Sequence, residues 1–366
     1  MPAYVINRII PPGSQLAPTM NISSISNVIL DKTSSPVALQ EALSSFVELC
    51  SEITGILPDP SFDAWAGDTL LGNGVAINSS AAAHCAIDYQ RSATFIRGTY
   101  AAIETLKLRF PKAPLEVLYA GCGPFATLLL PILGKFSAGE LRLNLLDIHQ
   151  RSIDSVELLL THFGLESHVV RTIREDACHY NHGQQLHLVI AETMQKSLEQ
   201  EPQFAVTANL APQLCPGGIF IPQRIDVAMC LADLNYERDL FKQSTRLDQS
   251  VPDFDSLRHS IATVCTLTPE NAASQIDTAR HCADTGAIEL RPITVTMPPA
   301  ANTDRLDAAL FTRIIVFEGY RLVDYESEIT LPLKCHGLAT LTEGTRYRVS
   351  YQLGSYPRFN FEYLDM

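Results

Sequence analysis

The sequence lacks the basic clusters that mark proteins acting on nucleic acids. Its 366 residues contain no run of Lys or Arg, and the formal net charge is −13. Binding to a duplex needs clustered basic side chains that contact phosphates. We therefore expect no nucleic-acid partner, and an acidic polymer should be repelled.

Paired cysteines and long apolar runs are also missing. The nine cysteines are scattered and form no C-x-x-C pair, so neither a zinc site nor a disulfide framework is predicted. No apolar run reaches the ~18 residues that a membrane span requires. The N-terminus does not have the charged and apolar segments of a signal peptide. We expect a soluble cytoplasmic protein with no metal site and no membrane partner.

The length and composition indicate several packed units. Hydrophobic residues make up 46% of the chain and charged residues 18%, which is ordinary for a soluble protein. We expect a helical N-terminal segment or lid over residues 1–110, an α/β domain over 111–222 and a β-barrel-like domain over 223–366. The third unit should carry an inserted arm at about 235–285.

Hydrophobic periodicity supports this division. After a loosely structured lead-in of about 35 residues, apolar positions recur at helical spacing over 35–56 and 79–108. Short apolar runs then alternate with helical stretches, which predicts an open and mostly parallel sheet with helices on its faces. The expected strands are 115–120, 141–146, 169–173 and 186–191, and the expected helices are 126–135 and 152–163.

Beyond residue 224 the expected elements are short strands of a largely antiparallel domain. Residues 235–284 are of mixed helical and loop character. The expected strands are 225–230, 293–297, 313–317, 337–341 and 346–353.

The strongest motif is a glycine turn at the end of a buried strand. Val117 to Phe125 reads V-L-Y-A-G-C-G-P-F, with Gly121 and Gly123 around Cys122. Such a turn lets the backbone approach a ligand closely, and a following helix would present free N–H groups. Tyr119 stands where an acid is usual, and Phe125 replaces the third glycine of the common pattern.

Two acids follow the next two strands of the expected sheet. Asp147, in the segment L-N-L-L-D-I, ends the next expected strand. There its carboxylate can accept hydrogen bonds from both hydroxyls of a ribose. Asp176, followed by Ala177, comes after the third strand, where methyltransferases often place an acid that binds the adenine amine. A nicotinamide dehydrogenase would share the glycine turn and Asp147, but the Asp-Ala pair favours S-adenosyl-L-methionine. We expect Tyr119, Gly121, Cys122, Gly123, Asp147, Ile148, Asp176 and Ala177 to bind it.

Further segments resemble the protein arginine methyltransferases, a family of class I S-adenosylmethionine-dependent enzymes. Residues 188–201, L-V-I-A-E-T-M-Q-K-S-L-E-Q-E, look like that family's double-glutamate loop, with Glu192 and Glu201 at the family spacing. Residues 88–95 resemble its D-x-x-R-T-x-x-Y helix, 214–222 the segment before its β-barrel, and 251–256 part of its arm. The resemblance covers roughly residues 85–360.

The resemblance implies roles for three charged side chains. Glu192 and Glu201 would grip a guanidinium through charge-assisted hydrogen bonds and leave one nitrogen lone pair free to attack. They are the candidate catalytic residues, and Glu192 also belongs to the expected cofactor site. Arg91 would pair with the carboxylate of the cofactor's methionine moiety. Arg97, further along the same helix, is the competing candidate.

The chain departs from the family at several positions. The T-H-W loop expected near Thr312 is absent, the only tryptophan is Trp65, and Met194 is followed by Gln and Lys instead of Gly and Tyr. Those groups help to shape a groove for an arginine side chain. A small-molecule acceptor is therefore preferred to a protein.

The sequence thus predicts an α/β fold with a Rossmann-like class I methyltransferase domain. We expect N-methylation of a guanidino or amino group of a small molecule, such as a free amino acid or a natural-product intermediate. Two alternatives stay open: an O- or C-methyltransferase of small-molecule biosynthesis, and a catalytically inactive cofactor-binding scaffold. The arm-like insertion indicates a possible homodimer.

Overall fold

In the computed structural model, residues 20–59, 67–112, 114–246, 252–281, 287–300 and 303–364 are described. Most of the predicted lead-in, Trp65 and two short parts of the predicted arm lie outside these residues. Among the described helices, none is long and apolar enough to span a membrane.

The first helices of the described residues are α1 (Ile22–Leu30) and α2 (Pro36–Thr54). The end signals of α2 are local in the sequence. Ser35 accepts a hydrogen bond from the Ala38 N–H at the start, where Pro36 occupies the first turn, and Gly55 ends the helix with φ 71°. A short hairpin that we did not predict follows, formed by β1 (Thr69–Leu71) and β2 (Gly74–Ala76).

The long helix predicted over 79–108 is two helices, α3 (Ser79–Cys85) and α4 (Tyr89–Arg109). Asp88 causes the break, because its side chain accepts a hydrogen bond from the Arg91 N–H and caps a new helix. The same carboxylate accepts hydrogen bonds from the Ser327 hydroxyl at 2.6 Å and the Glu328 N–H at 2.9 Å. The start of α4 is therefore fixed to the C-terminal part of the chain.

The middle of the chain forms a five-stranded parallel sheet with the order β5-β4-β3-β6-β7. This order starts in the centre, runs to one edge, returns and runs to the other edge, as in doubly wound α/β folds. Its strands are β3 (Leu115–Ala120), β4 (Leu141–Asp147), β5 (Val169–Arg174), β6 (Leu186–Ala191) and β7 (Leu214–Ile221), and its helices are α5 (Leu130–Leu133), α6 (Gln150–Phe163) and α7 (Gln203–Leu210).

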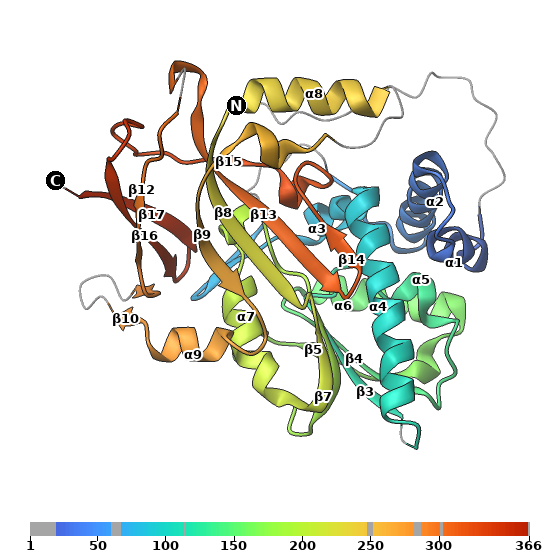
Figure 1. The fold of residues 1–366 in the computed structure, drawn as a ribbon. Helices are drawn as coiled ribbons and strands as arrows, with labels where there is room; N and C mark the ends of the chain where they lie inside the picture. The colour runs from blue at the N-terminus through green and yellow to red at the C-terminus, as the bar shows by residue number, and fades with distance from the viewer. Residues whose placement is uncertain are drawn as a thin grey trace.

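Both faces of this sheet are buried. Alternate residues of β3 face opposite sides: Val117 and Tyr119 belong to a core shared with the N-terminal helices, whereas Leu118 and Ala120 belong to a core shared with α7. Continuous apolar runs are typical of such doubly covered strands. Figure 1 shows α4 running between the N-terminal helices and the sheets.

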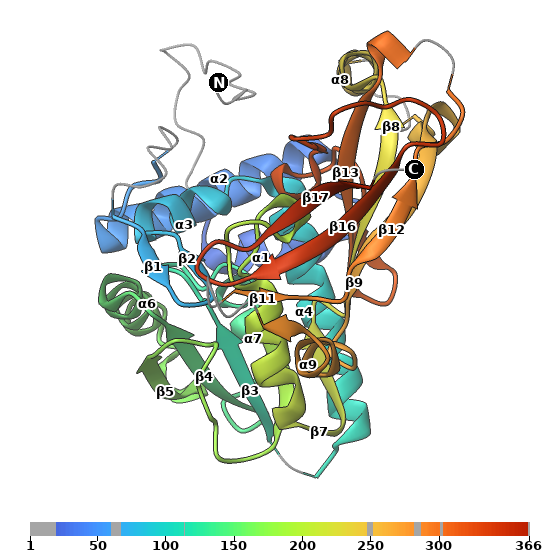
Figure 2. The same cartoon turned by 90° about the vertical axis from the view of Figure 1, so that its left-hand side faces the viewer.

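The C-terminal part consists of two antiparallel sheets. One has the order β14-β13-β8-β9 with β15 beside β13, and the other has the order β10-β11-β16-β12 with β17 beside β16. Figure 2 shows both sheets beyond the end of the parallel sheet. The strands are β8 (Arg224–Ala232), β9 (His259–Leu267), β10 (Arg280–His281), β11 (Ile288–Glu289), β12 (Ile293–Thr296), β13 (Asp307–Phe317), β14 (Tyr320–Leu322), β15 (Leu333–Lys334), β16 (Arg346–Leu353) and β17 (Arg358–Leu364).

Besides the divided helix over 79–108, four of our element predictions were wrong. The lead-in predicted as loosely structured over about 35 residues contains the helix α1. The helix predicted over 126–135 is reduced to α5, because the backbone turns at Ala126 with φ 42° and Pro131 opens the short helix. No strand forms over 337–341, where Gly337 has φ 89°. The region predicted as helix and loop over 235–284 holds α8 (Leu234–Arg246) and α9 (Ala272–Asp277), but also the nine-residue strand β9.

Candidate functional site

A cavity opens at the carboxyl ends of β3, β4 and β6. This is where the strand order reverses direction, the place where open α/β sheets bind ligands. The space here is about 930 Å³, including the part that is open to solvent. All eleven residues predicted for the site line it: Arg91, Tyr119, Gly121, Cys122, Gly123, Asp147, Ile148, Asp176, Ala177, Glu192 and Glu201.

The glycine turn forms the floor of the cavity. Gly121 and Gly123 have φ of 67° and 62°, values that side chains other than glycine rarely adopt. A Cβ on Gly121 would lie 2.5 Å from Thr193 Cγ2. The expected helix after this turn is missing, so free N–H groups come from the turn itself and not from a helix start.

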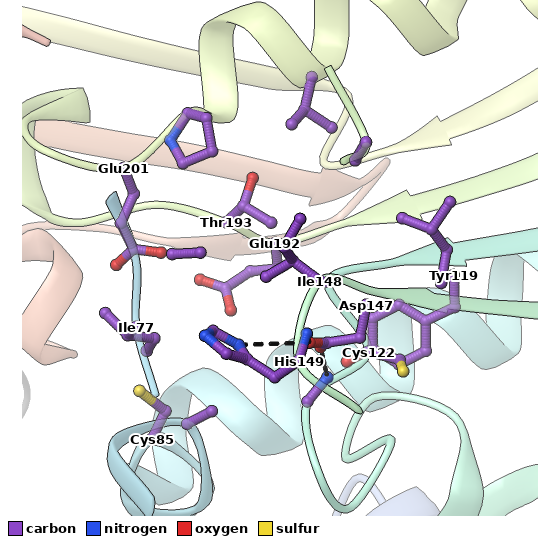
Figure 3. Close-up of a pocket in the computed structure, with 18 of the residues that line it drawn as sticks. Ile77, Cys85, Tyr119, Cys122, Asp147, Ile148, His149, Glu192, Thr193 and Glu201 are labelled. Carbon is purple, nitrogen blue, oxygen red and sulfur yellow. Dashed lines mark hydrogen bonds and ion pairs between the residues drawn. The ribbon is translucent and has the colours of Figure 1, made fainter. Parts of the chain in front are cut away.

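Asp147 lies beside the turn and holds it. Its Oδ2 accepts a hydrogen bond from the Gly123 N–H at 2.9 Å, and its Oδ1 accepts one from the His149 N–H at 2.8 Å. Figure 3 shows Asp147 and His149 together at the cavity. The His149 Nε2 in turn lies 3.1 Å from the Thr69 hydroxyl of the hairpin. Asp147 therefore links the glycine turn to the hairpin.

Asp176 and Ala177 line another part of the cavity, after β5. The Asp176 Oδ1 accepts a hydrogen bond from the Cys178 N–H at 2.9 Å, which fixes the carboxylate on its turn. Tyr119 and Cys122 are nearly fully buried at the turn. Burial raises the pKa of both side chains well above their usual values, so both stay protonated at neutral pH.

Arg91 forms an ion pair with the Glu192 Oε2. Helix α4 supplies Arg91, and the end of β6 supplies Glu192. The Glu192 Oε1 is buried and accepts no hydrogen bond from any residue that the structure describes. Burial raises the pKa of Glu192, and Arg91 opposes this shift. A buried oxygen without a donor is costly, and it marks a place where a ligand donor would be stabilised.

Glu201 is the second carboxyl group in this part of the cavity, and only 7% of its surface is exposed. Burial first and the charge of Glu192 second raise its pKa to about 8. Figure 3 shows the side chains of Glu192 and Glu201 directed into the same space. The two carboxyl groups therefore form one acidic end, opposite the ribose and adenine positions expected at Asp147 and Asp176.

The loop that carries both glutamates is strained. Ser197, Leu198 and Gln200 all have positive φ, between 58° and 68°. Contacts with the C-terminal sheets hold it: the Ser197 N–H donates to the Thr312 hydroxyl at 2.8 Å, and the Gln200 N–H donates to the Pro357 carbonyl at 2.8 Å. Strain of this kind persists where the surroundings fix the backbone, and it gathers at functional sites.

Of the two candidate arginines, Arg91 lines the cavity and Arg97 does not. The Arg97 guanidinium donates to the Ile29 and Asp31 carbonyls, at 2.6 and 2.7 Å.

Sequence reasoning missed the hairpin as part of the cavity wall. The segment L-L-G-N-G-V over 70–75 contains the turn signal Asn-Gly between apolar residues, which could have indicated it. The residues that we did not predict include His149, Thr193 and Cys85, and from the hairpin Leu71, Val75, Ala76 and Ile77. Among the described residues, no group of three or more His, Cys, Asp or Glu side chains is arranged to hold a metal ion.

Comparisons with known proteins give structural likeness only. The sequence matches no protein-family model and no curated protein. The structure of the chain aligns with a chain of the Trypanosoma brucei PRMT1 enzyme–prozyme heterotetrameric complex with AdoHcy. The sequence identity is 13% and the TM-score is 0.41, over 76% of this chain and 96% of that chain. The structure also aligns with Arabidopsis thaliana protein arginine methyltransferase 10, in an open conformation, at 10% identity and a TM-score of 0.42, over 76% and 97%.

The strand order confirms the predicted Rossmann-like α/β domain. This unit is preceded by helices and followed by a domain of antiparallel sheets.

Proposed function

We propose that this chain is an S-adenosylmethionine-dependent methyltransferase that methylates a guanidino or amino nitrogen of a small molecule. One observation carries the proposal. Residues from five separate segments, predicted for one cofactor and one acceptor, line one cavity at the switch point of the sheet.

The cofactor end fits S-adenosylmethionine by shape and by chemistry. The turn at Gly121 leaves no room for a Cβ, so backbone faces the ligand there. The Asp147 carboxylate would accept hydrogen bonds from the ribose hydroxyls, and Asp176 would accept one from the adenine amine. Arg91 would take the carboxylate of the methionine moiety. Bound there, the donor supplies an electrophilic methyl group on a sulfonium.

The acceptor end fits a cation. Two nearly buried carboxyl groups meet there, and the Glu192 Oε1 has no donor among the described residues. A guanidinium or ammonium group would provide that donor and a compensating charge. Glu192 would orient the nitrogen and localise its charge, so that the lone pair faces the methyl group.

Enclosure of the acceptor end supports a small acceptor. The side chain of Glu192 is 7% exposed, and Glu201 is 7% exposed. The hairpin contributes Val75 to the same cavity wall, and Ile77 just after it also lines the cavity. A free small molecule fits such an end better than a side chain that is attached to a polypeptide.

A second candidate, O- or C-methylation, is favoured by one feature of Glu201. A carboxyl group with a pKa of about 8 is mostly protonated at neutral pH, but its deprotonated fraction is a stronger base than an ordinary carboxylate. In that reaction Glu201 would act as a general base toward a hydroxyl or an acidic carbon. The acceptor panel described next separates the two candidates.

The test is transfer of a labelled methyl group to a panel of free guanidines, amines and hydroxy acids. Glu192→Gln should lower kcat/KM for a guanidine about a hundredfold, or about 3 kcal/mol, because the neutral amide loses the charge assistance. The affinity for S-adenosylhomocysteine should stay close to that of the wild type.

Glu201→Gln should give a similar or smaller loss, and the two losses should not add, because both groups hold one ligand. Glu199→Gln is the matched control, since Glu199 lies in the same loop but does not line the cavity. Wild-type turnover of guanidines in both glutamine variants would overturn the nitrogen-acceptor proposal, and turnover of hydroxy acids alone would support the second candidate.

A further inference from the structure

The hairpin β1–β2 lines the cavity and is held by hydrogen bonds at three points. At its first strand, the Thr69 hydroxyl lies 3.1 Å from His149 Nε2, next to Asp147. At its second strand, the Val75 N–H donates to the Gln200 carbonyl at 2.8 Å. At its base, Asp68 accepts hydrogen bonds from the backbone and side chain of Asn78. The hairpin is thus fastened to the ribose side and to the glutamate loop at once.

Gly74 fits tightly over the glutamate loop. A Cβ at this position would lie 2.7 Å from Pro202 N, 2.9 Å from the Glu201 carbonyl carbon and 3.0 Å from the Gln200 carbonyl oxygen. All three atoms belong to the backbone, so none can turn aside as the end of a flexible side chain would. The φ of Gly74 is 149°, which side chains other than glycine rarely adopt.

The backbone at Gln200 is held from both sides. Its carbonyl accepts from the hairpin and its N–H donates to Pro357 in the C-terminal part. With φ of 68°, Gln200 occupies a costly conformation that needs such support. Without the hairpin contact, the segment at Glu201 would lose one of the two restraints that keep it strained.

We propose that the hairpin β1–β2 is a clasp that, through Gly74, sets the position of the Glu201 carboxyl group at the acceptor end of the cavity. That this end of the cavity binds an acceptor rests on the function proposed above. The clasp itself is inferred only from the contacts of the hairpin. Gly74 is a positioning residue, because it acts through the backbone of Glu201 and does not face the cavity itself.

The clasp predicts an observable property of Glu201 that needs no substrate. Three charged groups change the pKa of this carboxyl group: Glu192 and Asp68 raise it, and Arg91 lowers it. The Gln195 side chain donates a hydrogen bond to it. The charge of Glu201 in turn raises the pKa of Cys85. Burial is the largest cause of its raised pKa. If the clasp opens, water reaches the carboxyl group, and its pKa must fall toward the ordinary value of 4.5.

The experiment is a titration of the Glu201 side-chain carboxyl carbon by NMR, assigned with Glu201→Gln. The wild-type midpoint should lie near 8. In Gly74→Ala the midpoint should fall by about one pH unit or more, because the added methyl group lifts the hairpin from the loop. Gly72→Ala is the matched control: Gly72 lies in the turn of the same hairpin, and a Cβ there meets nothing within 4 Å.

A second variant covers the case in which Gly74→Ala does not fold. Val75→Ala leaves the backbone unchanged and removes two methyl groups from the cavity wall, so it should lower the midpoint by a smaller amount. An unchanged midpoint in Gly74→Ala, or an equal fall in Gly72→Ala, overturns the clasp. If Gly74→Ala does not fold, an unchanged midpoint in Val75→Ala overturns it.

Kinetics provide the second readout once an acceptor is known. Gly74→Ala should lower kcat/KM for that acceptor about ten- to a hundredfold, as expected when a binding group is displaced by about 1 Å. The dissociation constant of S-adenosylhomocysteine should change less than about threefold. The proposed function fails if no acceptor is methylated, yet the titration still decides whether the clasp exists.

Discussion

At the scale of single residues, Glu201 couples the site to the stability of the protein. Its folded pKa of about 8 exceeds the ordinary value of 4.5, first through burial and then through Glu192. Between these two values the folded protein binds more protons at this group than the unfolded chain does. The stability contributed by protonated Glu201 is therefore complete below pH 4.5 and is lost as the pH rises toward 8.

We predict that Glu201→Gln removes this pH dependence. Relative to the variant, the wild-type free energy of unfolding should fall with rising pH by up to about 1.4 kcal/mol per pH unit inside that window. Urea unfolding at pH 5, 6.5 and 8.5 measures the difference, with Glu166→Gln on an exposed turn as the control. Parallel curves for wild type and Glu201→Gln would show that Glu201 is ionised in the folded protein.

Single residues also show how far the site could be predicted from the sequence. Asp147 and Asp176 follow successive strands, and because parallel strands end at one edge of a sheet, their convergence could be predicted. The pairing of Arg91 with Glu192 could not be, because the two residues are 101 positions apart. The choice between Arg91 and Arg97 depended on which side of α4 faces the sheet, and a helix with apolar residues on several sides does not reveal this.

At the scale of elements, strand predictions were correct where the residue pattern within the strand itself determines the structure. β3 and β6 have the predicted bounds, because buried strands read as short apolar runs between glycine and polar residues. β9 was missed because its nine residues are half exposed, and it is stabilised by pairing with β8, more than twenty-five residues away. Pairing between distant segments leaves no periodic signal in either one.

Helices α3 and α4 should respond to the cofactor. Both lie against the cavity, with Ala82 and Cys85 from α3 and Arg91 and Ser92 from α4 in its wall. A ligand that contacts them stabilises their folded form against local unfolding, so hydrogen exchange over residues 80–105 should slow when S-adenosylhomocysteine is added. Residues 358–364 of β17, none of which lines the cavity, are the internal reference. Unchanged exchange over 80–105 would separate these helices from the binding site.

At the scale of the whole molecule, the cavity depends on all three parts of the chain. The N-terminal part contributes the hairpin and Arg91, the parallel sheet contributes the glycine turn and both aspartates, and the antiparallel sheets hold the glutamate loop through Thr312 and Pro357. Helix α4 packs against the parallel sheet and against β13 and β14. The site should therefore form only in the folded, full chain, and a ligand bound there should stabilise all three parts together.

Calorimetric titration of the full chain with S-adenosylhomocysteine tests the central claim most directly. We predict saturable binding with one site per chain. Asp147→Asn, which keeps the shape but loses the charge, should weaken binding by about 1.5–3 kcal/mol, the range for hydrogen bonds to charged groups. Asp154→Asn, on the exposed side of α6, should bind like the wild type. The absence of binding to the folded wild-type chain, or equal affinity in both variants, would contradict the assignment of this cavity.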